Sequence, residues 1–388
     1  MPFTYSLRKL AKRCIGLLDL LVPKDPRLWV FYITPQTRWD ANMQCVYALA
    51  SERRDLRCLI CTLEPEGIPA DYRDHCIRFQ SPGGFARCLR AGVVFTDHAL
   101  IPGLTARRRW SVNLWHGVPI KAIRYFCPQH FPAGYLQEQS HGINLLVSSS
   151  DMDQAAMSAG FHLPLDRVAV TGLPRNDLLI NPQRFLPRLP HLARERDALT
   201  ALKNGRRLVL YAPTYRGASQ QPNPVITLTA EDEQLLAAVL QRQHAVLGVR
   251  AHNFSSQPMF ATLLEQGLAV NLSQQEYSNT NLLLEQVDLL VTDYSSIWVD
   301  FLLKQCPVLG FCPDLAEYTR ERGFLYRLEQ VFPGPIVSTI QALATALEQF
   351  LDGGFQPDDR YLRTTQLFHA YSDGGNTERV INAVLEPR

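Results

Sequence analysis

Short apolar runs alternate with helix-periodic segments along the first half of the chain. The runs expected to form strands cover residues 28–33, 58–62, 92–96, 112–115, 145–148 and 168–171. Segments with helical spacing of apolar residues, such as 41–51 and 152–159, separate them. Strands that alternate with helices are typical of a mostly parallel sheet with helices on its faces. The pattern therefore predicts a doubly wound α/β domain.

The alternation stops and then begins again in the second half. Residues 181–207 carry three prolines and many charges without a strand-like run, as expected of a linker. Further strands are expected at residues 208–212, 245–249, 268–270, 289–291 and 308–311, with helices at 231–243, 257–266 and 295–304. We predict the GT-B architecture, in which two Rossmann-like, doubly wound domains face an interdomain cleft. Ligands of open α/β sheets bind beside the carboxyl ends of the strands.

The same pattern sets the boundaries of five segments. We expect an amphipathic N-terminal helix over residues 1–22, an N-terminal Rossmann-like domain over 23–185, a linker over 186–206, a C-terminal Rossmann-like domain over 207–360 and a C-terminal helix over 361–388. Two domains also suit a length of 388 residues.

The first segment has apolar residues on one helical face and basic residues on the other. The apolar face holds Leu7, Leu10, Ala11, Cys14, Ile15, Leu18 and Leu21, and the basic face holds Arg8, Lys9, Lys12 and Arg13. Because the charges are interleaved with the apolar residues, a cleavable signal is not expected. The helix either lies on an anionic membrane surface or docks on its own domain. No run approaches the ~20 apolar residues of a membrane span.

Composition narrows the classes of partner. A net charge of +2 gives no argument for binding nucleic acid, so any anion must be bound by locally placed groups. The nine cysteines are scattered through apolar runs, which suits buried, reduced thiols of a cytoplasmic protein better than a disulfide framework. Cys58 and Cys61 have no second pair, so neither a zinc site nor a redox site is expected.

The first candidate site residue follows a predicted strand. His116 comes directly after the apolar run and is followed by Gly117 and Pro119, with Lys121 two positions further on. Histidine is the usual group for taking a proton from a hydroxyl at neutral pH. A single histidine is more often structural than catalytic, but the place of this one at a strand end, before a Gly and a Pro, favours a general base.

Two further strand ends carry cations and hydroxyls. Thr214 and Arg216 follow the run 208–212, where a hydroxyl and a guanidinium suit an anionic ligand. Arg250 and His252 follow the run 245–249 and point the same way on a pleated strand. Such a pair could clamp a diphosphate and neutralise a departing phosphate, or could be a surface pair on an exposed edge.

The fourth candidate is a strand that runs into a serine pair. Thr292 and Asp293 end the run, and Ser295 and Ser296 stand where a helix would begin. Free backbone N–H groups at a helix start form a phosphate cradle without a glycine-rich loop. Asp300, further along that helix, is either a solvated acid or a ligand for a ribose or polyol hydroxyl.

Four segments occur in an order that resembles one family. They are Leu-Trp-His-Gly-Val-Pro-Ile-Lys, Thr-Gly-Leu-Pro-Arg175-Asn176-Asp177, Tyr-Ala-Pro-Thr-Tyr-Arg and Thr-Asp-Tyr-Ser-Ser. Together, over residues 28–385, they resemble the CDP-glycerol glycerophosphotransferases, the family of teichoic-acid primases and polymerases. The resemblance implies a GT-B fold, no cofactor or catalytic metal, and a CDP-polyol donor. It maps the family's functional histidines to His116 and His252.

The resemblance also implies partners and a location. The donor would be CDP-glycerol or CDP-ribitol, with its diphosphate at Thr292, Ser295 and Ser296 in the C-terminal domain. The acceptor, a lipid-linked or oligosaccharide hydroxyl, would belong to the N-terminal domain. The enzyme would work in cell-envelope or capsule polymer synthesis, on the inner face of the cell membrane. The chain is closer in size to the primase-like members, which leaves single addition or polymerisation open.

Two alternatives use the same residues. A GT-B glycosyltransferase or epimerase that uses a nucleotide sugar would share the phosphate cradle, but it would release a nucleoside diphosphate rather than CMP. A non-catalytic nucleotide-binding scaffold would have little use for a general base at His116.

Overall fold

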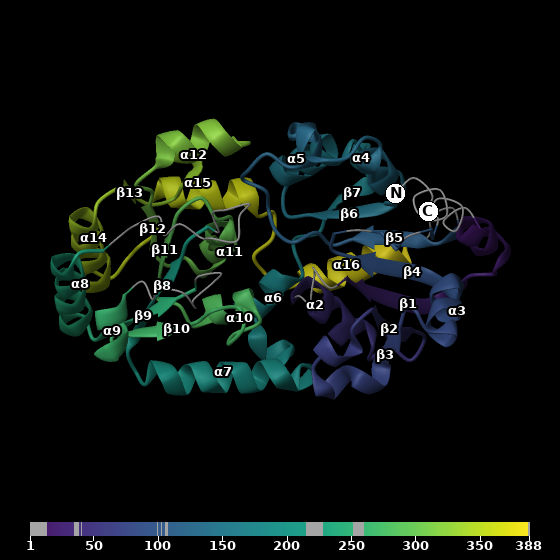
Figure 1. Cartoon of the computed structure of the whole chain (residues 1–388), viewed down its shortest axis with the longest axis horizontal. Helices are drawn as coiled ribbons and strands as arrows, with labels where there is room; N and C mark the ends of the chain where they lie inside the picture. The colour runs from purple at the N-terminus through teal and green to yellow at the C-terminus, as the bar shows by residue number, and fades with distance from the viewer. Residues whose placement is uncertain are drawn as a thin grey trace, which may run out of the picture. The chain divides into compact units, whose positions relative to one another are not determined.

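The computed structural model describes residues 14–34, 39, 41–98, 100–101, 103–104, 108–214, 228–250 and 260–386. The chain forms two compact units. The first consists of residues 1–116, 123–191 and 369–388, and the second of residues 117–122 and 192–368. Each unit contains one parallel sheet with helices packed against it (Figure 1). The prediction of two α/β domains is therefore confirmed.

The first unit is built on a seven-stranded sheet in the order β3-β2-β1-β4-β5-β6-β7. The strands are β1 (Asp25–Ile33), β2 (Arg57–Thr62), β3 (Cys76–Arg78), β4 (Ala91–Thr96), β5 (Trp110–Asn113), β6 (Leu145–Ser148) and β7 (Val168–Val170), and all pairs are parallel. The strand order reverses between β1 and β4. Phe31 of β1 stacks on Phe95 of β4 with ring centroids 4.8 Å apart, so the centre of the sheet is also the centre of the core.

Besides the N-terminal helix, six α-helices of this unit lie wholly within the described residues. They are α2 (Ala41–Ala50), α3 (Pro82–Arg90), α4 (Tyr135–His141), α5 (Asp151–Phe161), α6 (Arg175–Ile180) and, from the far end of the chain, α16 (Asn376–Leu385). The Asp177 carboxylate of α6 accepts hydrogen bonds from Thr377 N and Thr377 Oγ1, both at 2.7 Å, and from Asn376 N at 3.1 Å. A carboxylate on these amides satisfies the start of α16 and ties it to α6.

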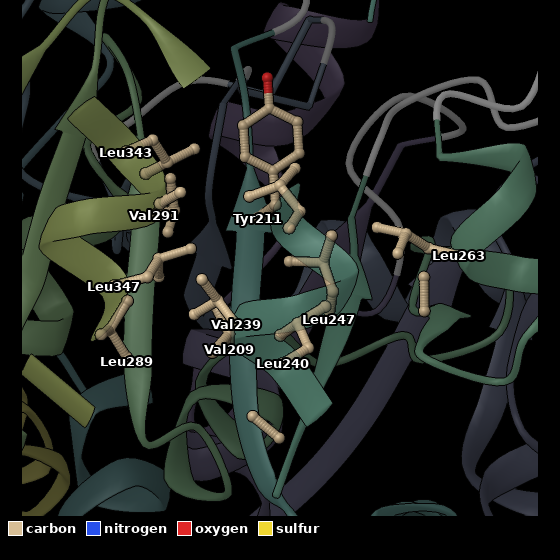
Figure 2. Close-up of a cluster of buried hydrophobic side chains, with 14 of the residues drawn as sticks. Val209, Tyr211, Val239, Leu240, Leu247, Leu263, Leu289, Val291, Leu343 and Leu347 are labelled. Atoms are coloured by element: carbon tan, nitrogen blue, oxygen red, sulfur yellow. The ribbon is translucent and has the colours of Figure 1, made fainter. Parts of the chain in front are cut away.

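The second unit has a six-stranded parallel sheet in the order β10-β9-β8-β11-β12-β13. The strands are β8 (Arg207–Ala212), β9 (Ala245–Val249), β10 (Ala269–Asn271), β11 (Leu289–Thr292), β12 (Val308–Phe311) and β13 (Ile336–Val337). Here the order reverses between β8 and β11. Alternate residues of these strands, such as Val209 and Tyr211, point to one face of the sheet. There they pack on α8 (Ala230–Arg242) and α14 (Ile340–Asp352), as Figure 2 shows.

Shorter helices lie between the strands of the second unit or after its last strand. They are α9 (Ala261–Glu265), α10 (Thr280–Glu285), α11 (Ile297–Phe301), α12 (Leu315–Arg322), α13 (Leu328–Val331) and α15 (Asp359–Phe368). The helix expected over 295–304 is thus α11 followed by a 3-10 turn, Leu302–Lys304. The strands β3 and β13 were not expected, because each is too short to show a pattern in the sequence.

Two of the expected segment boundaries differ from the structure. The linker expected over 186–206 is mostly the helix α7 (Pro190–Lys203). Proline suggested a linker, but Pro190 is the first residue of the helix, where its missing N–H is not needed. The single helix expected over 361–388 is two helices, α15 and α16. Residues 369–388 belong to the first unit because Asp177 and the neighbouring helices hold α16 there.

The part of the N-terminal helix that the structure describes, residues 14–21, is docked through its polar side. Asp19 is buried, accepts a hydrogen bond from Lys24 Nζ at 2.8 Å and forms an ion pair with Arg109. Leu17 and Leu21 are 65% and 77% exposed. Both alternatives thus keep support, since the helix is anchored to its own unit and still presents apolar side chains. Within the described residues, every helix is too short or too polar to span a bilayer.

Candidate functional site

His116 is presented by a strained turn at the end of β5. Leu114 N still donates to Thr96 O at 2.8 Å, which continues the sheet for one residue. Trp115 then has φ 51° and Gly117 has φ 132°, so both neighbours of His116 lie in the left-handed region. For a tryptophan this conformation is strained, and such strain persists only where the surroundings impose it. Gly117 is needed here because its φ is unsuited to a side chain.

Side-chain hydrogen bonds to the backbone impose this turn. Asn113 Oδ1 accepts from Trp115 N at 2.8 Å, and Asn42 Nδ2 of α2 donates to Trp115 O at 2.9 Å. Arg175 Nη1 donates to His116 O at 2.5 Å, and Arg175 N donates to Asn42 Oδ1 at 2.9 Å. Asn42 and Arg175 therefore form one linked support, which fixes the backbone on both sides of the His116 Cα.

A second histidine lies against the first. His98 follows β4, the strand beside β5, and its ring stacks on that of His116 with centroids 4.1 Å apart and planes 14° apart. The centroid of the Trp115 ring is 3.9 Å from that of the His116 ring. Asp97 is buried, and its Oδ1 is 3.7 Å from His98 Nδ1. The sequence analysis did not identify His98, although the signal was available: an Asp-His pair directly after a strand-like run.

The surroundings favour the neutral form of His116. Its pKa is lowered, first because nearby protein disfavours the charged ring, and then because His98 and Arg175 carry like charge. A hydrogen bond with the Asp97 backbone opposes the shift. The side chain keeps an exposed surface, where water moderates the desolvation. A neutral imidazole has one nitrogen that can accept a proton.

The second unit brings Thr214 and Asp293 together where its strand order reverses. Thr214 follows β8 and Asp293 follows β11. Asp293 Oδ1 accepts from Thr214 N at 2.7 Å and from Tyr294 N. Thr292 Oγ1 donates to Ala212 O at 2.7 Å, so this hydroxyl is engaged within the sheet. The Thr214 hydroxyl, in contrast, is buried without a hydrogen-bond partner among the described residues.

Ser295 and Ser296 precede a short helix. Ser295 Oγ accepts from Ile297 N at 3.4 Å, and Ser296 is the N-cap residue without a side-chain capping bond. The helix α11 has only five residues, so its dipole is small. Any anion bound here would depend on hydroxyls and backbone N–H groups rather than on the helix dipole.

Asp300 and Arg250 are both engaged inside the second unit. Asp300 is 2% exposed and accepts from Asn281 Nδ2 at 3.4 Å, so it is not a solvated acid. The Arg250 guanidinium donates to Leu272 O at 2.8 Å, to Tyr277 O at 3.1 Å and to Thr280 Oγ1 at 2.9 Å. Burial lowers the pKa of Arg250 to about 10, which leaves it charged at neutral pH. Arg250 is not on an exposed strand edge, and it holds the segment 272–280.

Lys121 lies beside the Asp293 segment although it comes from the His116 motif. Residues 117–122 belong to the second unit, where Lys121 forms an antiparallel bridge with Phe324. The Lys121 Nζ is 5.5 Å from the centroid of the Tyr318 ring, which in turn stacks on Tyr294 at 4.0 Å. The Tyr318 ring therefore lies between the Lys121 ammonium and Tyr294, the residue that follows Asp293.

The structure places the other expected site residues in different environments. Arg175 contacts the His116 turn, Asn176 is buried in α6, and Asp177 holds α16 instead of facing a ligand. Arg216 and His252 lie outside the described residues, so their roles stay predictions. Among the described residues, no group of three or more His, Cys, Asp or Glu side chains could hold a metal ion.

Comparison with known proteins identifies relatives. The sequence model of a family described as CDP-Glycerol:Poly(glycerophosphate) glycerophosphotransferase matches residues 16–386. The chain is 25% identical over 390 residues to the teichoic acid ribitol-phosphate polymerase TarK of Staphylococcus aureus (strain NCTC 8325 / PS 47), covering 96% of this chain and 71% of TarK. It is 26% identical to a teichoic acid glycerol-phosphate transferase of the same strain, covering 72% of each.

A solved structure shares the fold. A variant of the wall teichoic acid polymerase TagF with CDPG superposes with a TM-score of 0.78 at 18% identity, covering 99% of this chain and 97% of the other. At this identity the similarity shows a common fold. It confirms the GT-B prediction, and the family match confirms the resemblance found in the four motifs.

Proposed function

Because the chain belongs to the CDP-glycerol:poly(glycerophosphate) glycerophosphotransferase family, it is a phosphotransferase, and we propose how its residues carry out the transfer. The donor is CDP-glycerol or CDP-ribitol, and the acceptor is a hydroxyl of a lipid-linked or oligosaccharide chain of the cell envelope. The observation that supports this mechanism best is the imposed turn at His116, which presents a neutral imidazole at a strand end.

The reaction is a displacement at phosphorus. The acceptor oxygen forms a bond to the phosphorus that carries the polyol, and the bond from that phosphorus to the oxygen bridging to CMP breaks. CMP leaves with the bridging oxygen, and His116 takes the proton of the acceptor hydroxyl. A lowered pKa keeps the ring neutral before the reaction. The negative charge of a bound diphosphate would raise that pKa and strengthen the base.

The groups proposed to hold the donor come from the second unit. The hydroxyls of Thr214, Ser295 and Ser296 and the nearby backbone N–H groups can donate to phosphate oxygens. Asp293 keeps the two strand-end loops together, and Lys121 supplies a cation. Arg250 acts indirectly, by holding the segment 272–280. The predicted contributions of His252 and Arg216 to the diphosphate site remain part of the proposal.

Attachment to the inner face of the cell membrane is a separate proposal. The basic residues of the segment 1–22 would be attracted to anionic lipid, and the exposed Leu17 and Leu21 would enter the interface. Their exposure beside the buried Asp19 supports this arrangement, because a helix docked only for stability would bury its leucines instead.

The deciding experiment measures which nucleotide is released. Purified protein is incubated with CDP-glycerol or CDP-ribitol and a lipid-linked or oligosaccharide acceptor. Acceptor-dependent CMP from one donor, lost in His116→Ala, supports the mechanism and identifies the donor. His75→Ala is the matched control, because His75 is exposed on the same unit. If neither CDP-polyol binds and a UDP-sugar yields UDP, the nucleotide-sugar alternative replaces the proposal.

A further inference from the structure

The first unit contains a hollow of about 610 Å³ that the proposed chemistry does not use. Its walls come from the segment between β5 and α5, including α4, and from the residues that follow α5. Tyr125, Phe131, Gln137, Ser140, His162 and Arg167 are among the side chains that line it. The hollow is open on one side and is large enough for one sugar or polyol-phosphate unit.

The hydroxyl of one lining residue, and the guanidinium of the residue that precedes another, have hydrogen-bonding capacity that the described part of the chain does not use. Ser140 lines the hollow and is 5% exposed, and its hydroxyl has no partner among the described residues. Arg124, next to the lining residue Tyr125, is 6% exposed. Its Nε and Nη2 likewise have no partner in the described part of the chain. A buried polar group without a partner is costly, so a ligand in the hollow that supplies an acceptor would satisfy the Ser140 hydroxyl.

Arg124 is a buried cation held by an aromatic ring. Its guanidinium lies 4.1 Å from the centroid of the Phe161 ring, and the structure shows no carboxylate paired with it among the described residues. Burial lowers its pKa, because the charged form loses its hydration. An anion beside Arg124 would compensate for that loss.

The walls add a guanidinium, two imidazoles and aromatic surface. Arg167, His141 and His162 line the hollow, whereas none of its lining residues is Asp or Glu. Tyr125 stacks on His162 with centroids 3.5 Å apart and planes 8° apart. Guanidinium and imidazole groups suit phosphate oxygens, and flat aromatic rings suit the C–H surface of a polyol or sugar. The combination fits an anionic, hydroxylated ligand better than an apolar one.

The hollow is connected to the His116 turn by packed side chains of the same unit. Phe161, which carries the Arg124 guanidinium, contacts the Trp115 ring edge-on with centroids 5.0 Å apart. Trp115 is the strained residue directly before His116. Trp115 and Phe161 belong to the same buried cluster as Leu163, which lines the hollow. A ligand in the hollow would therefore press on the structure that presents His116.

We propose that this hollow binds a phosphate-bearing polyol or sugar unit of the acceptor. Arg167 neutralises the phosphate, the Ser140 hydroxyl donates to it, and Tyr125 contacts the carbon chain, while the buried charge of Arg124 adds to the positive potential behind Tyr125. This inference rests on the proposed function, because it names the acceptor as the ligand. A phospholipid headgroup has the same chemistry of phosphate and polyol, so the experiment must separate a soluble chain from a lipid surface.

The experiment measures binding directly on the full-length protein. A water-soluble oligo(glycerol phosphate) is titrated by calorimetry into the unmodified protein, Arg167→Gln, Tyr125→Leu and Arg54→Gln. Arg54→Gln is the matched control, because Arg54 is an exposed arginine of the same unit outside the hollow. Loss of a charge-assisted hydrogen bond should weaken oligomer binding about tenfold in Arg167→Gln, while the control stays unchanged.

Kinetics separate the inference from the proposed function. In Arg167→Gln the acceptor KM should rise about tenfold, with kcat at saturating acceptor and the donor KM unchanged. Acceptor-dependent CMP release with unaltered oligomer binding in both hollow variants would overturn the inference alone. Weaker binding in the variants of a protein that releases no CMP would support the hollow while the transfer proposal fails.

A vesicle-binding measurement separates a soluble acceptor from a lipid surface. Sedimentation with phosphatidylglycerol vesicles should give equal binding for the unmodified protein and Arg167→Gln. If the hollow variants lose vesicle binding and keep oligomer binding, the ligand is a lipid headgroup and the acceptor assignment is wrong.

Discussion

The two units differ in the groups that they present at the ends of their strands and in how those groups are held. In the first unit a single side chain, His116, is presented by a strained turn that side chains of α2 and α6 impose from outside the sheet. In the second unit the loops after β8 and β11 are joined by a carboxylate, Asp293, and present hydroxyls and backbone groups. The difference suits the roles proposed for the two units, because a base must be held in one orientation and a phosphate accepts several donors at once.

The largest expected effect comes from removing the presented side chain itself. His116→Ala should lower kcat by roughly 10²–10⁴-fold, because a positioned general base contributes about that much. Donor binding, measured by calorimetry with CDP-glycerol or CDP-ribitol, should change little, since the groups proposed to hold the donor belong to the second unit. A well-folded His116→Ala with near-normal turnover would show that His116 is not the general base, and the contrast between the two units would lose its basis.

Asp177→Ala tests whether the Arg-Asn-Asp segment has two separate tasks. The change leaves the first amides of α16 without their acceptor and should cost about 2 kcal/mol of folding free energy, measured by urea unfolding. At temperatures where the variant is folded, its kcat should match that of the unmodified enzyme. A large loss of kcat without a loss of stability would place Asp177 in the chemistry instead.

Arg175→Ala tests the other end of that segment. Loss of the hydrogen bond to His116 O should loosen the turn and lower kcat about tenfold, with the donor KM unchanged. Asn42→Ala should have a similar effect, because Asn42 holds Trp115 O and Arg175 N. The double variant should lose less than the product of the two single effects, since both residues support one turn. Fully multiplicative losses would contradict the linked support.

The smallest expected effect is a shift in a pH profile. The pKa of His116 lies below its usual value, so the acidic limb of kcat/KM should fall below about pH 6.5, and activity is lost as the pH drops through that limb. His98→Phe keeps an aromatic ring but removes a charge that lowers this pKa, so the limb should move to higher pH. An unchanged limb would mean that His98 does not act on His116 electrostatically.

Local pattern was enough to predict much of the fold. The buried parts of the parallel strands, such as residues 28–33 of β1 and 91–95 of β4, are apolar throughout, so they appear in the sequence as continuous runs. The candidate residues at strand ends were found for the same reason, because each directly follows a run. Elements without such a run were missed: β3 and β13 are too short, and α7 begins with a proline that suggested a linker.

The partners of those residues could not be predicted from sequence. Asn42 and Arg175 are separated by more than a hundred positions, yet a hydrogen bond joins them beside the turn at His116. Asp177 lies within a family motif and Asp300 follows another, and only burial and hydrogen bonds show that the first caps α16 and the second is internal. His98 follows a strand just as His116 does, but its stacking on His116 depends on which strands are neighbours in the sheet.

By itself, the sequence determined the α/β alternation, the family motifs and the residues that stand at the ends of strands. These depend on local periodicity and on residue chemistry, which can be read in a short window. Only the tertiary structure decided which unit residues 117–122 and 369–388 join and which side chains impose the turn at His116. It alone shows that the first unit contains a hollow lined by Ser140, whose hydroxyl has no partner among the described residues. These depend on contacts between distant segments, which hydrophobic burial selects and a local pattern does not encode.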